Sequence, residues 1–300
     1  MNYNDKVQEI LSAHGLDFNI IKRPLISVEN GEEFITPYYG LFNSASGECI
    51  NTVKEGYTVS QNSEVVEMIL KGTEKYSDEL SVKFAGSLNG GRRVFMQLAI
   101  EGDSKVGDDV IKRYVTIIDS NDGSTGLSVG IGDLTMSCSN QFFRFYKSGD
   151  AKFRHTETLT KKIQTIPYLI ETALAESMRQ IKVYNKFQST KVSRDLANDM
   201  VKYILGYDRV ITSVAEQSKL TSRSLGIMED LYNHIDKEMK QKGDNLWGLH
   251  SGVTSWTTHS KPGPKRTNGH IESMLVGAGY KKNQESLNFA TKYAGISHLV

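Results

Sequence analysis

Three aspartates near one predicted turn are the side chains best suited to catalysis. Asp119, Asp122 and Asp133 are close in sequence, and convergent carboxylates can hold a divalent metal for phosphodiester chemistry. Aspartate beside glycine is also a common turn former, which explains Asp119 and Asp122 without any metal. The pattern therefore favours a structural turn. It leaves a metal-dependent nuclease, using these carboxylates near Arg154 and His155, as an alternative.

No other motif indicates an enzyme or a metal site. The chain has no P-loop, dinucleotide fingerprint, zinc-protease helix, nucleophile elbow or Cys-x-x-Cys pair. His250 and His259 do not have the close helical spacing that zinc ligands favour. Cys49 and Cys138 are far apart, as is typical of ordinary thiols in a reducing compartment. We therefore expect no catalytic residue, no metal and no cofactor.

Positive charge is concentrated in the second half of the chain. Residues 1–143 hold 12 Lys and Arg against 20 Asp and Glu, a net charge of −8, whereas residues 144–300 hold 24 against 15, a net charge of +9. Clustered cations gain free energy by displacing counterions from a phosphate backbone, which points to a polyanionic partner. The same charges also suit a solvated helix face, so both interpretations stay open.

The densest basic stretch runs from Arg144 to Arg194, and aromatic residues interleave with its cations. Bases of a single strand can stack on such rings while cations follow the backbone. Strand alternation places about half of the rings in the core. The rings that interleave with the cations around the start of this stretch are Phe142, Phe143, Phe145, Tyr146 and Phe153.

A second phosphate-binding signal is the sequence Arg154-His155-Thr156 at the start of a predicted helix. Backbone donors at a helix start, together with nearby cations, can receive a phosphate. Alternatively, Thr156 or Thr158 only caps the helix. The candidate nucleic-acid contacts are Arg92, Arg93, Lys112, Arg113, Arg144, Lys147, Lys152, Phe153, Arg154, His155, Lys161 and Lys162.

Strand and turn patterns dominate the first half. Asn-Gly-Gly at position 89 and Ser-Asn-Asp-Gly-Ser at position 120 favour tight turns between strands. A third turn is expected around Asn43–Gly47. The predicted elements are a helix at Asn4–His14, a hairpin at Pro37–Val53, a helix at Asn62–Tyr76, and hairpins at Leu80–Ile100 and Arg113–Met136.

From Thr160 onward the apolar period changes to about 3.6, which indicates helices. Ser193 is a suitable N-cap and Gly206 a suitable end for the second of them. The predicted helices are a long one through Ile163 and Ile181, then Arg194–Leu205, Ser222–Gly243, one after Asp244, and short pieces at Ile271–Val276 and Gln284–Ala294. The fold class is therefore α+β, with an antiparallel hairpin-rich N-terminal half and an α-helical C-terminal half.

The length and composition suit a folded protein of two domains, which we expect at residues 1–150 and 151–300. Hydrophobic residues make up 38% of the chain, with 14 Tyr and 11 Phe. No apolar run reaches the roughly 20 residues of a membrane span, and the N-terminus has no signal-peptide pattern. We expect a cytoplasmic protein that does not bind membranes.

Five short motifs resemble a family of phage- and plasmid-like proteins catalogued as a domain of unknown function. The resemblance covers nearly the whole chain, although Gln141-Phe142-Phe143 replaces an expected Thr-Leu run after Asn140. It implies a mobile-element origin and action in the host cytoplasm, without an established activity. The motifs are Gly90–Phe95, Ser120–Ser124, Cys138–Asn140, Arg154–Thr156, and Asn245–Gly248 continuing through Thr254 to His259.

The order of strands and helices is also similar in outline to phage single-strand annealing proteins of the Red-beta and Erf type. This fold-level analogy implies an oligomer that binds or anneals single-stranded DNA in recombination or replication, with phage or host replication proteins as further partners. A non-enzymatic DNA-binding protein is thus the first hypothesis. The alternatives are the metal-dependent nuclease and a phage protein that binds a host protein through its acidic N-terminal half.

Overall fold

The computed structural model describes residues 3–76, 78–137, 139–145, 152–207, 220–260 and 269–299. Two compact units are present. Unit 1 comprises Met1–Glu101, Tyr114–Ile131 and Phe145–Ala175, and unit 2 comprises Gly102–Arg113, Gly132–Arg144 and Glu176–Val300. Each unit takes segments from both sides of position 150. This grouping describes packing, and the domain boundary near residue 150 stays a prediction.

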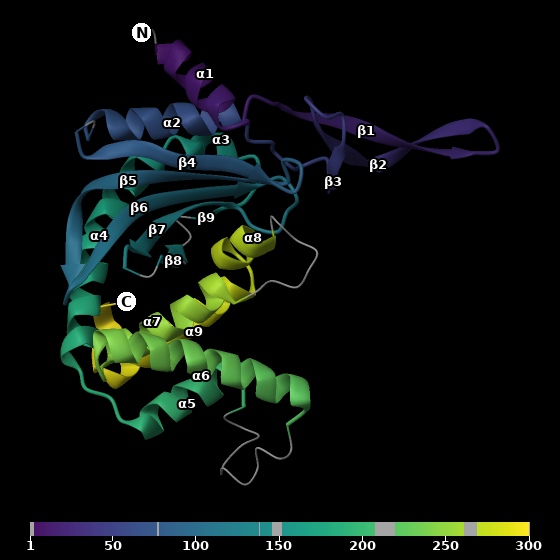
Figure 1. The fold of residues 1–300 in the computed structure, drawn as a ribbon. Coiled ribbons are helices and arrows are strands. Elements are labelled where there is room, and N and C mark those ends of the chain that lie inside the picture. The colour runs from purple at the N-terminus through teal and green to yellow at the C-terminus, as the bar shows by residue number, and fades with distance from the viewer. Residues whose placement is uncertain are drawn as a thin grey trace. The chain divides into compact units, whose positions relative to one another are not determined.

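The structure confirms the α+β class, with antiparallel strands in the N-terminal half and helices in the C-terminal half (Figure 1). One sheet has the order β1-β2-β3. A second has the order β4-β5-β6-β7-β8, and β9 pairs with β7. The strands are β1 (Ile20–Glu29), β2 (Glu32–Asn43), β3 (Cys49–Lys54), β4 (Leu80–Leu88), β5 (Arg93–Val106), β6 (Asp109–Ser120), β7 (Leu127–Thr135), β8 (Asn140–Phe145) and β9 (Lys152–Phe153).

The single long helix predicted through Ile163 and Ile181 is two helices in the structure, Leu159–Ile163 and Ile166–Ser189, and the other predicted helices form. The ends of the helices follow from local chemistry. The Ser193 hydroxyl accepts a hydrogen bond from the Leu196 amide, and Gly206 closes the same helix with φ of 73°. None of the helices in the described ranges is long and apolar enough to cross a membrane. The helices are α1 (Tyr3–Ala13), α2 (Asn62–Glu74), α3 (Leu159–Ile163), α4 (Ile166–Ser189), α5 (Arg194–Leu205), α6 (Ser222–Lys242), α7 (Leu246–His259), α8 (Gly269–Leu275), α9 (Ala278–Tyr293) and the 3₁₀ turn η2 (Ser297–Leu299).

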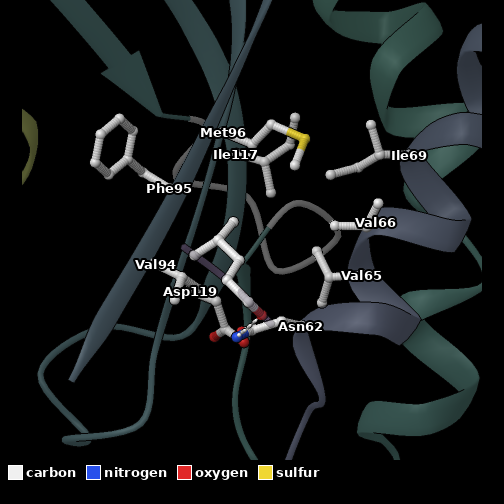
Figure 2. A pocket seen from close by; sticks show the side chains of 10 residues that line it. Asn62, Val65, Val66, Ile69, Val94, Phe95, Met96, Ile117 and Asp119 are labelled. Carbon is white, nitrogen blue, oxygen red and sulfur yellow. Dashed lines mark hydrogen bonds between the residues drawn. The ribbon is translucent and has the colours of Figure 1, made fainter. Parts of the chain in front are cut away.

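The core of unit 1 lies between α2 and the second sheet. Residues of β5 alternate between buried and half-buried, so that Val94 and Met96 face α2 while Phe95 points to the opposite side (Figure 2). Val65 and Ile69 of α2 meet them from across the core. A cavity of about 20 Å³ remains between these layers. That is room for about one water molecule, so the gap is a packing space rather than a ligand pocket.

The core of unit 2 is built mainly from helices and is rich in aromatic rings. Tyr184 of α4 lies 4.8 Å from Trp247 of α7, measured between ring centroids, and both side chains are buried. Val106, Ile111 and Phe142 also belong to this core. Strand residues from the N-terminal half of the chain therefore complete the hydrophobic core of the helical unit.

Two strands in the first half are additional to the predicted hairpins. β1 pairs with β2 around a tight turn at Asn30 and Gly31, whose φ angles are 53° and 85°. Such positive angles are typical of hairpin turns. The outer residues of β1 and β2 are largely exposed, so they lack the regular apolar alternation by which a strand is recognised. The other additional strand is β8.

Candidate nucleic-acid interface

The predicted contacts in β9 and in the two residues after it alternate between exposed and buried side chains. Lys152 and Arg154 are exposed, whereas Phe153 and His155 are 2% and 8% exposed. Successive side chains of an extended segment point to opposite sides, which accounts for this alternation. The expectation that Phe153 offers an exposed stacking surface is therefore wrong, because its ring belongs to the core of unit 1.

β9 is held in place by close backbone contact with β7. Leu127 pairs with Phe153 and Ser128 with Lys152. A Cβ atom on Gly126 would lie only 2.0 Å from the Phe153 carbonyl oxygen, so the two chain segments approach at a distance that only glycine allows. This pairing fixes the direction in which Lys152 points.

His155 anchors the residues that follow β9 to two other parts of unit 1, the end of β6 and the segment between β3 and α2. Its Nε2 lies 2.9 Å from Asp119 Oδ1 at the end of β6, and its Nδ1 lies 3.0 Å from the Thr58 carbonyl oxygen. The Tyr57 ring stacks on the imidazole, with 4.8 Å between centroids and 7° between planes. Ser60 donates a hydrogen bond to Asp119 Oδ2.

The partners of His155 favour its charged form. A carbonyl and a carboxylate both accept hydrogen bonds, so both ring nitrogens are required as donors. Burial opposes the imidazolium, but the hydrogen bond to Asp119, the charge of that carboxylate and the Thr58 carbonyl outweigh it and raise the pKa of His155. Burial, with the charge of Asp119, also raises the pKa of Tyr57. The cluster is thus a buried support beneath the exposed Arg154.

α3 adds two more cations on the same stretch of chain. Lys161 is exposed, and Lys162 is half-buried with its Nζ 5.9 Å from the centroid of the Phe153 ring. Thr158 precedes α3 but makes no capping hydrogen bond with its side chain. We call Lys152, Arg154, Lys161 and Lys162 the basic segment.

The predicted contacts on the hairpins have separate surroundings. Arg92 is exposed and lines an open hollow of about 580 Å³ with Glu48 and Asn89. Arg93 lies 3.3 Å from Asp122 in an ion pair and also donates to Ser124. Lys112 forms an ion pair with Asp103. Of these three, Arg92 is the one that is exposed, as a phosphate contact must be.

Arg113 and Arg144 serve the interior of unit 2. Arg113 is 8% exposed and donates to Ser177 Oγ at 3.2 Å, while Arg144 donates to Gln180 Oε1 at 3.0 Å. Both cations act on the buried Asp133. The prediction of a solvent-facing phosphate contact is wrong for Arg113, because its guanidinium is buried. Lys147, like Cys138 and Tyr146, lies outside the described residues.

The three aspartates of the nuclease alternative have different partners. Asp119 binds His155 and Ser60, Asp122 pairs with Arg93, and Asp133 Oδ2 accepts a hydrogen bond from Tyr184 at 3.0 Å. Burial raises the pKa of Asp133 to about 7. Across the described ranges, no three His, Cys, Asp or Glu side chains converge as metal ligands would. The geometry therefore does not assemble the predicted carboxylate site.

Some residues of the buried support were not among the sequence candidates. Tyr57, Thr58 and Ser60 meet His155 and Asp119 across separations of up to 98 residues. Their local sequence, which only leads into α2, contains no pattern that marks such a contact.

Comparison with known proteins places the chain in a family but attaches no activity to it. No curated protein and no solved structure match the chain. A family model described as a domain of unknown function (DUF932) matches residues 49–290, which is most of the chain and includes the buried support, β9 and the basic segment. The chain therefore belongs to the DUF932 family.

Proposed function

We propose that this protein binds single-stranded DNA through the basic segment. One observation carries the proposal: within the described residues, Lys152, Arg154 and Lys161 are exposed and form no ion pair. Glu157 is the single acidic residue in this stretch of chain. Unpaired, solvated cations on a supported backbone are the groups that displace counterions from phosphates.

The rigid attachment of these cations supports the same function. β9 is paired with β7, and His155 ties the following turn to Asp119 and Thr58. A fixed row of charges loses less conformational entropy on binding than charges on a free loop. Phe153 is buried beneath this surface, so phosphate contacts rather than stacking on that ring provide the affinity.

Phosphate contacts fix position without reading bases, so the binding is independent of sequence. Such binding suits a protein that protects or anneals strands during recombination or replication in the cytoplasm of a host cell. Arg92, on the turn between β4 and β5, provides an additional exposed cation in unit 1.

Fluorescence anisotropy with short single- and double-stranded DNA at several salt concentrations tests the proposal. We expect the parent to bind single strands with log affinity falling linearly with log salt. Each phosphate contact contributes about 0.7 to that slope for single strands. The double variant K152E/K161E should therefore bind weakly at all sequences, with a slope lower by about 1.4.

K237E/K240E is the matched control, because Lys237 and Lys240 are exposed cations on α6 and the net charge change is identical. It should bind like the parent. A parent that fails to bind at low salt, or an equal loss of affinity in both double variants, would remove the basic segment as the binding surface.

A further inference from the structure

The outer part of the β1–β2 hairpin is a two-stranded arm. β3 pairs with Tyr38–Phe42 of β2, so within the part of the chain that the structure describes no third strand lies beside the residues from Ile26 to Ile35. Figure 1 shows β1 and β2 continuing past β3 as a long ribbon. An isolated two-stranded hairpin is only marginally stable in water. We call Ile26–Ile35 the hairpin arm.

The arm exposes large apolar side chains on both faces. Ile26 pairs directly with Ile35, so these two share a face with Val28; they are 48%, 86% and 64% exposed, respectively. Phe34, on the opposite face, is 46% exposed. Apolar groups gathered on a protruding element mark an interaction surface more often than a free surface.

The tip of the arm is acidic. Glu29 pairs directly with Glu32, and Glu33 follows; all three are exposed. Like charges placed opposite each other across two strands destabilise a hairpin. Within the described residues none of the three carboxylates forms an ion pair. A partner that brings cations to the tip would remove this repulsion.

We propose that the hairpin arm docks on the basic segment of a second copy of this chain. The second copy presents the complementary charges, because Lys152, Arg154 and Lys161 are exposed cations without an acidic partner in the described residues. Tyr168, near the start of α4, is 67% exposed and supplies an apolar surface further along the same stretch. Three carboxylates thus meet at least three cations.

This contact joins two different surfaces, so it is heterologous. Each copy retains a free arm at one end and a free basic segment at the other, and the contact therefore generates rings or filaments. The docking needs no nucleic acid. Because it uses the cations proposed above to bind phosphates, single-stranded DNA and the arm compete for them.

Sedimentation velocity with charge-reversed variants tests the docking. The parent should form assemblies at low salt that dissociate as salt is raised, because exposed charges are screened. The tip variant E29K/E32K/E33K and the segment variant K152E/R154E/K161E should each be monomeric alone. Mixed in equal amounts, they should assemble again, because each arm then faces a segment of opposite charge.

Two further variants control for unrelated effects. E9K/D17K/E74K changes three exposed acidic residues outside the arm and should assemble like the parent. I35S removes the most exposed apolar side chain of the arm without changing its charge, and it should weaken assembly without changing the circular dichroism spectrum, because the Ile35 side chain is 86% exposed. DNA binding of the tip variant separates the two proposals, since its basic segment is intact.

A parent that is monomeric at low salt overturns the docking proposal, as does a mixture of the two charge variants that stays monomeric. A monomeric parent whose arm captures a different, basic protein also overturns it and favours the host-partner hypothesis. Failure of the parent to bind DNA, with assembly and rescue as expected, rejects the proposed function alone.

Discussion

At the scale of single residues, burial separates side chains that the sequence grouped together. Arg154 and His155 are neighbours in the chain and both are candidate phosphate contacts. Arg154 is exposed, whereas His155 is held by Asp119 and the Thr58 carbonyl in the interior of unit 1. In the proposed function, His155 therefore positions its neighbour and does not itself contact phosphate.

The His155–Asp119 pair predicts a pH dependence of stability. The folded pKa of His155 is raised above its ordinary 6.5. The contribution of charged His155 to the free energy of unfolding is therefore complete below pH 6.5. It is lost as the pH rises through the raised pKa of the folded protein. Each unit of pKa shift corresponds to about 1.4 kcal/mol. We expect the protection against hydrogen exchange in peptides covering 114–131 and 152–163, corrected for the intrinsic effect of pH on exchange, to fall over that range.

H155Q should exchange faster at acidic pH and show a flatter pH profile, because glutamine carries no titrating charge. H14Q is the control, at a histidine without an ion pair in the described part of the chain. An unchanged pH profile in H155Q would mean that another group governs this transition.

At the scale of elements, a two-residue strand positions the basic segment. β9 has little packing of its own, so its pairing with β7 and the buried Phe153 must hold it. The close approach of Gly126 to the Phe153 carbonyl is the most constrained point of this arrangement. Any side chain at position 126 pushes β9 away from the sheet.

G126A is therefore expected to displace β9 and lower the free energy of unfolding by about 2 kcal/mol, within the usual range of destabilising point mutations. It should also weaken DNA binding, because Lys152 and Arg154 lose their fixed orientation. Thermal unfolding and anisotropy measure the two effects. G86A is the control, since a Cβ there meets Phe95 at an ordinary 3.5 Å. Equal stability of the two variants would contradict this role of Gly126.

At the scale of the whole molecule, the two units are interleaved along the chain. Unit 2 consists mainly of the C-terminal helices, yet its core includes Val106, Ile111 and Phe142 from the N-terminal half. Removing those residues opens this core, and Phe142 in particular packs on Tyr184 of α4 and His250 of α7. Loss of one large buried side chain typically lowers the free energy of unfolding by about 2–5 kcal/mol. A chain without the N-terminal half lacks several such side chains at once.

A fragment of residues 151–300 is thus expected to lack cooperative unfolding. Both tryptophans, Trp247 and Trp256, lie in unit 2, so their fluorescence reports on it directly. The full chain should show a sigmoidal fluorescence change in denaturant, and the fragment a gradual one. A cooperative transition in the fragment would instead support a domain boundary near residue 150.

The local sequence was sufficient for the α+β class and for most elements. Ser193 and Gly206 mark the ends of α5, and the turns at Asn89 and Ser120 fall between the strands predicted there. These features depend on residues within a few positions of each other. Helix capping, turns with positive φ and the spacing of apolar residues are all set by such local sequence. β1 was missed because its outer residues face solvent on both sides.

What only the tertiary structure decided is which candidates reach solvent and which partners they meet. The Ser60, Asp119 and His155 side chains join across tens of residues, and Arg113 is drawn into unit 2 by contacts with α4. Charge and residue type are properties of the sequence, but exposure depends on how the strands and helices pack. Among the described candidates, long-range packing therefore leaves Arg92 and three cations of the basic segment exposed, and it buries others such as Phe153, His155 and Arg113.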